Sequence, residues 1–582
     1  MKLPELYEIP VTREMVDVFG GYNHRLRIDT GEFYDMENMT SDHYPVLAPR
    51  KERGTFLSEV NCQGLICKDA LCWVDGTKFV MNGYPVEMNL SVLPDDCPKK
   101  LVGMGAYVII LPDKKWINTA DLTEHGNIEA RVTTSGKITY TLCDATGNAY
   151  TVDVRSENAP ENPEDGTIWM DMSGDKPALK EWSESSGMWV SIASVYVRID
   201  KTGIGKPFSE YDGVTISGFG EESSLKDLMG ANVIQAKGDD YIVVTGIFSA
   251  GSLSRTEPLT VERLMPEMDF VIESGNRLWG CRYGPDRSGN VVNEIYASKL
   301  GDFKNWNCFM GISTDSYAVS VGTDGQFTGA VTHLGYPCFW KEGHLHKVYG
   351  NYPANFQVQT TACRGVQKGC DRSLAIVGEA LYYKSRSGIC AYDGSLPREV
   401  SAQLGEERYS EAVGGALGNK YYVAMKDTKG KTPLFVLDTA RGLWHKEEST
   451  PVQQFCACDG ELYRIDEKGA IRTMLGSGVK ENQQVRWMAE TGPLGVDQPD
   501  RQYISRITLR LQMAIGAQVR IWAQYDSQGS WECLGTIPGR NLRTMAVPVR
   551  PRRCDHLKLR IEGRGDCRIF SVTRSIEYGG EI

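Results

Sequence analysis

The sequence lacks the segments that mark secreted and membrane proteins. Its first residues, MKLPELYEIPVTREM, contain no basic stretch followed by an apolar core, so we expect no secretory signal. The longest apolar run, residues 101–112, is too short to cross a bilayer. These absences predict a soluble protein that is made inside the cell and has no membrane-spanning segment.

The motifs of well-known active sites are also missing. The sequence has no P-loop, no G-x-S-x-G and no H-E-x-x-H. Its 8 histidines are scattered, and His344 and His346, two apart on an expected strand, have no third metal ligand nearby. Among the 75 acidic residues no pair stands out as the two carboxylates of a glycosidase. We therefore expect no catalytic, cofactor-binding or metal-binding residues, no cofactor, and a protein that is not an enzyme.

The 16 cysteines do not have the spacing of a metal site or of a disulfide framework. Most lie inside apolar strand-like runs, as Cys72, Cys281 and Cys338 do, where a thiol behaves as a small hydrophobic group. Free, buried thiols indicate folding in a reducing cytoplasm.

What the sequence does contain is a repeat. Residues 373–401 form two short apolar runs, each followed by a polar turn, and similar segments recur along the chain. A turn glycine before an aromatic strand appears at Gly335, Gly378, Gly418 and Gly460, at intervals of 43, 40 and 42 residues. A period of about 40–45 residues is typical of four-stranded propeller blades. The repeat predicts an all-β protein with a β-propeller of five to seven blades.

Changes in composition divide the chain into segments. Residues 122–262 interrupt the repeat, and alternation with period 2 after residue 500 indicates two packed sheets. The end of the interruption, 236–262, could instead belong to the propeller. The expected segments are an N-terminal arm (1–55), first propeller blades (56–121), an inserted β-rich module (122–262), main propeller blades (263–475), a linker (476–500) and a C-terminal β-sandwich (501–582).

The inserted module contains three tryptophans, Trp169, Trp182 and Trp189, in a stretch rich in Pro, Gly, Ser and Asp. They could form the core of a small β module, which needs large side chains to bury enough area. They could also be exposed and contact a partner or a glycan. The core interpretation is the more economical, and the exposed one makes these tryptophans the candidate site.

The net charge of −11 is unevenly distributed. Residues 491–582 carry 14 Lys+Arg and 9 Asp+Glu, a balance of +5, so the remainder carries about −16. An acidic body does not bind a phosphate backbone tightly, although DNA could slide along it. The simpler interpretation is a solvated surface. The same choice applies to the C-terminal arginines, which are solvated or form a basic face: Arg506, Arg510, Arg520, Arg552, Arg553 and Arg560.

Several segments resemble a known family. FGGYN at 19–23, EFYDMENM at 32–39 and YPVLAPRKERG at 44–54 resemble the opening of bacteriophage tail-nozzle-type virion proteins. MDFVIESGNRLWGCRYG at 268–284 is similar to blade segments of prophage tail proteins of Gram-positive bacteria. The resemblance covers about 1–120 and 236–475, and the tryptophan-rich insertion has no counterpart that we can identify.

The resemblance implies a structural subunit of the virion tail, made in the cytoplasm of the host bacterium. Such subunits form a ring, typically sixfold, below the portal and adaptor, and the ring surrounds a channel through which phage DNA passes without sequence-specific binding. Its partners would be further copies of itself, the portal or adaptor, and tail-fibre proteins. The alternative is a carbohydrate-binding or glycan-cleaving β-propeller protein of the tail or of a host cell, and a cytoplasmic propeller scaffold is a third possibility.

Overall fold

The computed structural model describes residues 11–94, 98–220, 223–480, 484–496, 502–539, 543–548 and 554–578. Within these ranges the chain forms strands and no α-helix; the helical turns are four short 3-10 segments, Lys226–Leu228, Pro353–Asn355, Asp371–Ser373 and Ala402–Leu404. The predicted all-β fold class is therefore confirmed. In the described part of the chain no helix is long and apolar enough to cross a membrane.

The chain divides into two compact units, each of which is described by itself. One comprises residues 1–99, 340–345 and 361–582, and the other comprises 100–339 and 346–360.

Six sheets are built from four consecutive antiparallel strands each, which is the arrangement of β-propeller blades. They are β6–β9 (Cys62–Lys68, Ala70–Asp75, Lys78–Met81, Tyr84–Glu87), β10–β13 (Lys100–Met104, Tyr107–Leu111, Lys115–Asn118, His125–Asn127), β26–β29 (Phe270–Ser274, Arg277–Pro285, Val291–Ala297, Tyr317–Ser320), β30–β33 (Phe327–His333, Tyr336–Lys341, His344–Tyr349, Gln357–Ala362), β34–β37 (Ala375–Val377, Ala380–Lys384, Ile389–Tyr392, Arg398–Glu399) and β38–β41 (Ser410–Leu417, Lys420–Lys426, Pro433–Asp438, Leu443–Ser449).

The turn glycines predicted from the repeat explain the local geometry. Gly335, Gly378, Gly418 and Gly460 have φ of +79°, +62°, +58° and +76°, and each stands between the first and second strand of its sheet. A positive φ at a tight hairpin turn is easily adopted by glycine and disfavoured for other residues. A side chain there would meet no neighbour within 4 Å, so the requirement comes from the backbone conformation and not from crowding.

A further sheet joins the two ends of the repeat region. Its order is β42-β43-β44-β5-β45, so a strand from the N-terminal arm lies among strands that follow residue 450. Its strands are β42 (Gln454–Cys458), β43 (Glu461–Ile465), β44 (Ile471–Thr473), β5 (Gly54–Leu57) and β45 (Val479–Lys480). Thr55 lies opposite Arg472 on one side and Val479 on the other.

Neighbouring sheets within each unit bury apolar side chains against one another. Leu65 and Trp73 of the β6–β9 sheet form one cluster with Ile465 and Ile471 of the β42–β44 sheet. In the other unit, residues of the β10–β13 sheet cluster with residues of the β26–β29 sheet, and the latter with the β30–β33 sheet. Face-to-face packing of successive blades is how propellers build their core.

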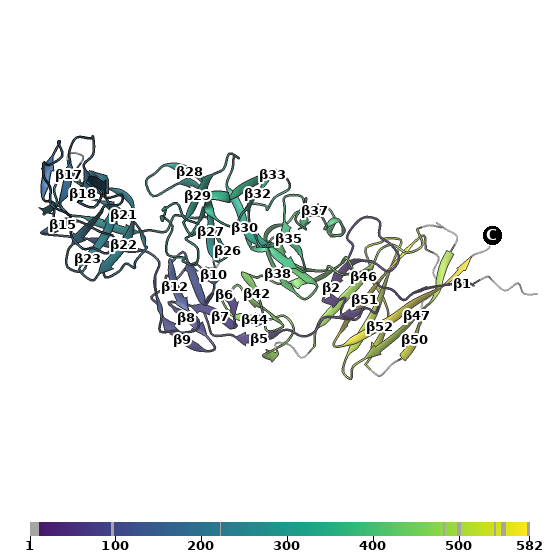
Figure 1. The fold of residues 1–582 in the computed structure, drawn as a ribbon. Coiled ribbons are helices and arrows are strands. Elements are labelled where there is room, and N and C mark those ends of the chain that lie inside the picture. Colours follow the sequence, from purple (N-terminus) through teal and green to yellow (C-terminus); the bar gives the residue numbers. More distant parts are fainter. Residues whose placement is uncertain are drawn as a thin grey trace, which may run out of the picture. The chain divides into compact units, whose positions relative to one another are not determined.

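The inserted module has two sheets. The larger has the order β14-β25-β21-β22-β23-β20-β15-β24, with β14 (Ala130–Thr133), β15 (Ile138–Cys143), β20 (Tyr196–Asp200), β21 (Gly213–Ser217), β22 (Gly230–Gly238), β23 (Tyr241–Thr245), β24 (Ser252–Arg255) and β25 (Thr260–Arg263). The smaller is β16 (Val154–Ser156), β17 (Ile168–Asp171), β18 (Ala178–Ser183) and β19 (Met188–Ser191). Figure 1 labels β17 and β18 near β15, β21 and β22.

Of the two alternatives for 236–262, the strand pairing favours the inserted module over the propeller. β23, whose sequence YIVVT resembles a blade strand, pairs with β20 and β22 of the larger sheet of the module. β25 pairs with β14 at the start of the insertion. A short apolar run indicates a buried strand but cannot identify the sheet to which it belongs.

Two sheets contain the C-terminal strands. One is β1 (Val11–Val16), β52 (Cys567–Tyr578), β47 (Gln502–Met513) and β50 (Arg543–Pro548); the other is β2 (Phe33–Glu37), β46 (Arg486–Thr491), β51 (Leu557–Arg564), β48 (Gln518–Tyr525) and β49 (Glu532–Pro538). The first of these is visible in Figure 1 as neighbouring ribbons labelled β1, β47, β50 and β52. In β51 buried residues alternate with partly exposed ones, and β48 alternates in the same way as far as Ala523, as period 2 predicts.

Two boundaries differ from the sequence interpretation. The N-terminal arm, predicted as a separate segment, contributes β1 and β2 to the C-terminal sheets, the short pair β3 (Met39–Thr40) and β4 (Ala48–Pro49), and β5 to the sheet of β42–β45. The expected linker, 476–500, includes β45 and β46, and β46 lies between β2 and β51. β1 is exposed at five of its six residues, so it carries no hydrophobic alternation that sequence could reveal.

Candidate functional site

The structure brings Trp169, Trp182 and Trp189 together on one face of the β16–β19 sheet. Trp182 lies directly opposite Trp189, and Trp169 lies opposite Lys180. Because side chains alternate along a strand, these four residues point to the same side. The ring centroids of Trp169 and Trp189 are 5.3 Å apart and those of Trp182 and Trp189 are 5.4 Å apart, both at 63° in edge-to-face contact.

Charged groups surround the buried tryptophan of this cluster. Trp169 is 5% exposed, and its indole N–H donates to the Ser156 carbonyl at 3.1 Å. The Lys180 ammonium lies 4.9 Å from the Trp169 ring centre and donates to Asp171 Oδ2 at 2.8 Å. Hydrogen bonds from Lys180 and Ser173 lower the pKa of the Asp171 carboxyl to about 2. The ion pair therefore stays charged down to low pH.

The opposite face of the same sheet is buried. Met170 and Leu179 belong to the apolar cluster of the larger sheet, which also contains Val197 and Ile242. Trp182 and Trp189, in contrast, remain partly exposed. The tryptophan cluster is thus neither of the two alternatives alone: one ring is core, and two rings border solvent beside an ion pair. Partly exposed rings beside fixed polar groups can hold the apolar face and the hydroxyls of a sugar.

A polar cavity of about 720 Å³ lies among β35–β39 and their loops. Four carboxylates line it, namely those of Glu399, Glu406, Glu407 and Asp427, together with Lys384, Arg386 and Arg408.

Two groups in this cavity have perturbed ionisation. Lys384 is buried and donates to Gln367 Oε1 at 2.8 Å, and burial lowers the pKa of its ammonium. The Tyr409 hydroxyl donates to Glu407 at 3.1 Å, and burial together with that carboxylate raises the pKa of the phenol. Sequence reasoning missed this cavity because its carboxylates belong to no spaced motif.

The histidine pair does not form a metal site. His346 is buried, and its ring nitrogens lie 2.8 Å from Thr323 Oγ1 and 2.9 Å from Thr360 Oγ1, whereas His344 is half-buried. Across the described residues no group of three or more His, Cys, Asp or Glu side chains is arranged to hold a metal ion.

The expectation that the cysteines are unpaired is wrong for one pair. Cys67 and Cys458 form a disulfide between β6 and β42, which lie in adjacent sheets. The spacing could not reveal it, because the two residues are separated by 391 positions and only the packing of the first sheet against the last brings them together. Most other described cysteines are buried and form no disulfide; Cys72 and Cys338 are examples.

The C-terminal arginines are placed only in part. Arg560 donates to Glu490 Oε2 at 2.7 Å and lies over the ring of Trp531, and Arg520 is 4.0 Å from Glu562. Arg552 and Arg553 lie outside the described residues. These contacts mix both signs of charge on one face of the sheet.

Comparisons with known proteins give fold-level similarity alone. No protein-family model matches the chain, and no characterised protein matches it in sequence. Among solved structures it is similar to AztD from Citrobacter koseri (11% identity, 87% of this chain and 99% of that chain, TM-score 0.26), to an exo-β-1,3-galactanase from Phanerochaete chrysosporium (8%, 51% and 94%, TM-score 0.20) and to the Trypanosoma rangeli sialidase (8%, 91% and 96%, TM-score 0.20).

These similarities correct one expectation. The chain was expected not to be an enzyme, but several of the matching structures are glycoside hydrolases and one is a sialidase. At these TM-scores they assign no activity to this chain, and they name no phage protein.

Proposed function

We propose that this chain is a structural subunit of a bacteriophage tail, forming a nozzle-like ring below the portal and adaptor. In this proposal the ring encloses a channel for DNA, its outer surface carries other tail proteins, and it is part of the virion after assembly in the host cytoplasm. The observation that carries the proposal is the structural role of the arm segments on which the family resemblance rests.

The FGGYN segment contacts the β38–β41 sheet and holds the arm against it. The Tyr22 N–H donates to the Trp444 carbonyl at 2.6 Å. Gly21 has φ of +80°, and a Cβ there would lie 2.6 Å from the same carbonyl oxygen. Only glycine allows the backbone this close approach. Gly21 therefore serves to attach the arm to this sheet.

The second segment, EFYDMENM, connects the C-terminal sheets to the same blade-like sheet. The Asn38 side chain donates to the Arg486 carbonyl at 2.9 Å in β46 and accepts from Arg50 Nε at 2.9 Å. Arg50 in turn lies 3.2 Å from Glu447 in β41, and Arg53 pairs with the same carboxylate. The segments that carry the family resemblance thus make structural contacts between sheets, as expected of a structural subunit.

The architecture we infer has seven blades, an inserted module and a C-terminal β-sandwich. The six sheets of consecutive strands supply six blades, and the sheet of β42, β43, β44 and β5 supplies the seventh. A strand from the N-terminus that completes the last blade would close the ring without leaving free edges. The two sheets of C-terminal strands form the sandwich in this proposal.

Charge supports a role beside DNA. Residues 122–262 hold 11 Lys+Arg and 22 Asp+Glu, a balance of −11, so the insertion is the most acidic part of the chain. Acidic surfaces repel the phosphate backbone, which favours passage over binding.

Light scattering after size-exclusion chromatography, with negative-stain imaging, tests the proposal. The expected result is a closed ring of copies, or one formed when the portal or adaptor protein is added, because heterologous contacts that close give rings. A protein that remains monomeric at all concentrations and with both of those proteins would refute it.

A second candidate function, carbohydrate binding, is favoured by the tryptophan cluster. Trp182 and Trp189 are partly exposed beside the Lys180–Asp171 ion pair. Host cell-wall glycans would be the relevant ligands for a tail protein.

Binding of cell-wall polysaccharide to the purified chain tests the second candidate. Trp182→Ala should lower affinity at least tenfold if the ring stacks on sugar, whereas Tyr84→Ala, which removes an exposed ring in the unrelated β9, should not. Release of reducing sugar, and its loss in Glu399→Gln, would show cleavage at the polar cavity. If Trp182→Ala and Tyr84→Ala both bind polysaccharide as well as the unmodified protein does, the tryptophan face is excluded as the binding site.

A further inference from the structure

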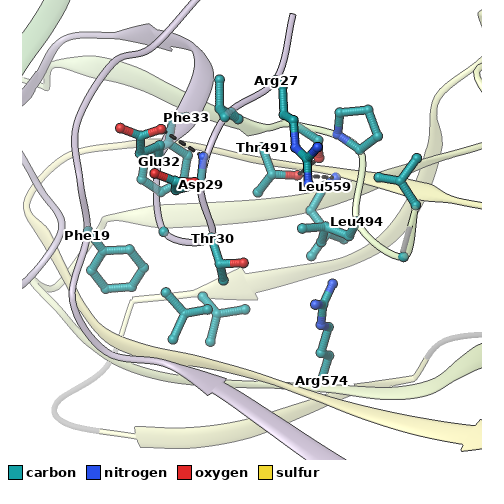
Figure 2. A pocket seen from close by; sticks show the side chains of 18 of the residues that line it. Phe19, Arg27, Asp29, Thr30, Glu32, Phe33, Thr491, Leu494, Leu559 and Arg574 are labelled. Atoms are coloured by element: carbon teal, nitrogen blue, oxygen red, sulfur yellow. Dashed lines mark hydrogen bonds between the residues drawn. The ribbon is translucent and has the colours of Figure 1, made fainter. Parts of the chain in front are cut away.

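A cavity of about 540 Å³ lies at the C-terminal sheets. Val572 of β52 contributes one wall, and Leu559 and Ile561 of β51 contribute another, so the cavity lies where the two sheets separate. The loops 26–32 and 492–496 border it, as Figure 2 shows. The volume is within the range of about 300–1,000 Å³ that is typical of small-molecule sites.

The loop over this cavity is held in place without a ligand. The Glu32 carboxylate accepts from the Asp29 N–H at 2.8 Å and from the Asn23 amide at 2.6 Å. Gly31 has φ of +99°, and a Cβ there would lie 2.6 Å from the Val18 carbonyl oxygen. The entrance is therefore preformed, which reduces the entropy lost when a ligand binds.

Arg574 offers an unused donor inside the cavity. Its side chain is 17% exposed, and its Nε donates to Glu14 Oε2 at 2.6 Å while Nη2 pairs with the same carboxylate. Nη1 is buried and has no hydrogen-bond partner among the described residues. A buried guanidinium N–H without an acceptor is unfavourable, so an oxygen that reached this nitrogen after a small shift of the Arg574 side chain would be stabilised there.

A second guanidinium reaches the cavity from the loop. Arg27 is exposed, makes no ion pair among the described residues, and approaches from the side opposite Arg574 in Figure 2. Two carboxylates also line the cavity: Asp29 is exposed, and Glu32 is already engaged by two donors. The lining also includes aliphatic and aromatic side chains, Phe19 among them, together with the hydroxyls of Thr30 and Thr491.

We propose that this cavity binds a small amphiphile with a carboxylate head and an apolar body, of the size of a medium-chain fatty acid. The carboxylate accepts from Arg574 Nη1 and from the Arg27 guanidinium, because planar guanidinium groups match carboxylate oxygens. The apolar body lies against Val572, Leu559 and Ile561. This inference does not depend on the proposed role in a tail.

Displacement of 8-anilinonaphthalene-1-sulfonate, an anion with an apolar body, tests the inference on the full chain. Laurate below its micellar concentration should displace the probe with one site per chain. Dodecyl maltoside and dodecyltrimethylammonium have the same tail with a neutral and a cationic head, and should bind at least tenfold more weakly. Equal affinity for laurate and the two other amphiphiles would indicate nonspecific binding to an apolar surface and would overturn the proposal. The absence of laurate binding would also overturn it.

Variants assign the head group to the arginines. Arg27→Gln and Arg574→Met should each lower the affinity for laurate about tenfold or more, as expected for loss of a charged hydrogen bond. Arg27 is exposed, so its replacement should not affect folding. Arg520→Gln, on β48 and outside the cavity lining, is the matched control and should change nothing. Val572→Phe should fill the cavity and abolish binding of probe and laurate alike. Unchanged laurate affinity in Arg27→Gln and Val572→Phe would overturn the proposal even if Arg574→Met fails to fold.

Discussion

Replacing Arg53 by methionine should destabilise the joint between the arm and the β38–β41 sheet. Arg53 and Glu447 are each 5% exposed at the side chain, and Arg53 Nη1 also donates to Thr450 Oγ1 at 2.9 Å. Removing one partner of a buried ion pair costs about 3–5 kcal/mol, because the other charge remains without compensation. Arg50, 3.2 Å from Glu447, still compensates part of that charge. We therefore expect a destabilisation at the lower end of this range, about 3 kcal/mol.

Urea unfolding followed by tryptophan fluorescence measures this loss. The double variant Arg53→Met with Glu447→Leu should return to within about 1 kcal/mol of the unmodified protein, because two apolar groups of similar size can replace a buried pair. Lys426→Met removes a pair exposed at both partners, Lys426–Glu411, and should cost less than about 1 kcal/mol. A loss below about 1 kcal/mol in Arg53→Met, or an equal loss in the double variant, would refute the reasoning.

Three further predictions concern the same unit. Gly54→Ala should destabilise strongly because its Cβ would lie 2.1 Å from the Ser477 carbonyl oxygen, whereas Gly343→Ala, with no atom within 4 Å, should be neutral in thermal unfolding. Burial and nearby Lys420 lower the pKa of His445 from 6.5 to about 4, so the stability from its neutral form is full above pH 6.5 and decreases by about 3 kcal/mol as pH falls to 4; His445→Gln should flatten that dependence in urea midpoints measured against pH. Peptide mapping without reductant should recover Cys67 linked to Cys458, and the two peptides should separate after reduction; recovery of both as free thiols from an oxidised preparation would contradict the bond.

The parts of the fold that sequence could predict are those fixed by local chemistry. The turn glycines recur because each hairpin needs a positive φ next to a strand, and the period of that requirement is the length of one blade. The three tryptophans were noticed as a set because they lie close in the sequence and a small sheet needs large side chains. In both cases the signal and the structure that it predicts involve neighbouring residues.

What sequence could not predict depends on contacts between distant segments. β23 is as apolar as a blade strand, and only its pairing with β20 shows that it belongs to the insertion. The strands of the arm are short or exposed and carry no period of 2. Arg27 and Arg574 line one cavity although they stand near opposite ends of the chain, and each alone is an ordinary charged residue.

The pairing of three arm strands with distant parts of the chain has a consequence for the order of folding. β1, β2 and β5 pair with β52, β46 and β44, so each of these strands leaves the ribosome several hundred residues before its partner. Until then the edges they complete stay open, and pairing across so many residues is slow. The nascent chain therefore spends most of its synthesis with unpaired strands, and we expect its yield to depend more on chaperones and translation rate than its final stability would suggest.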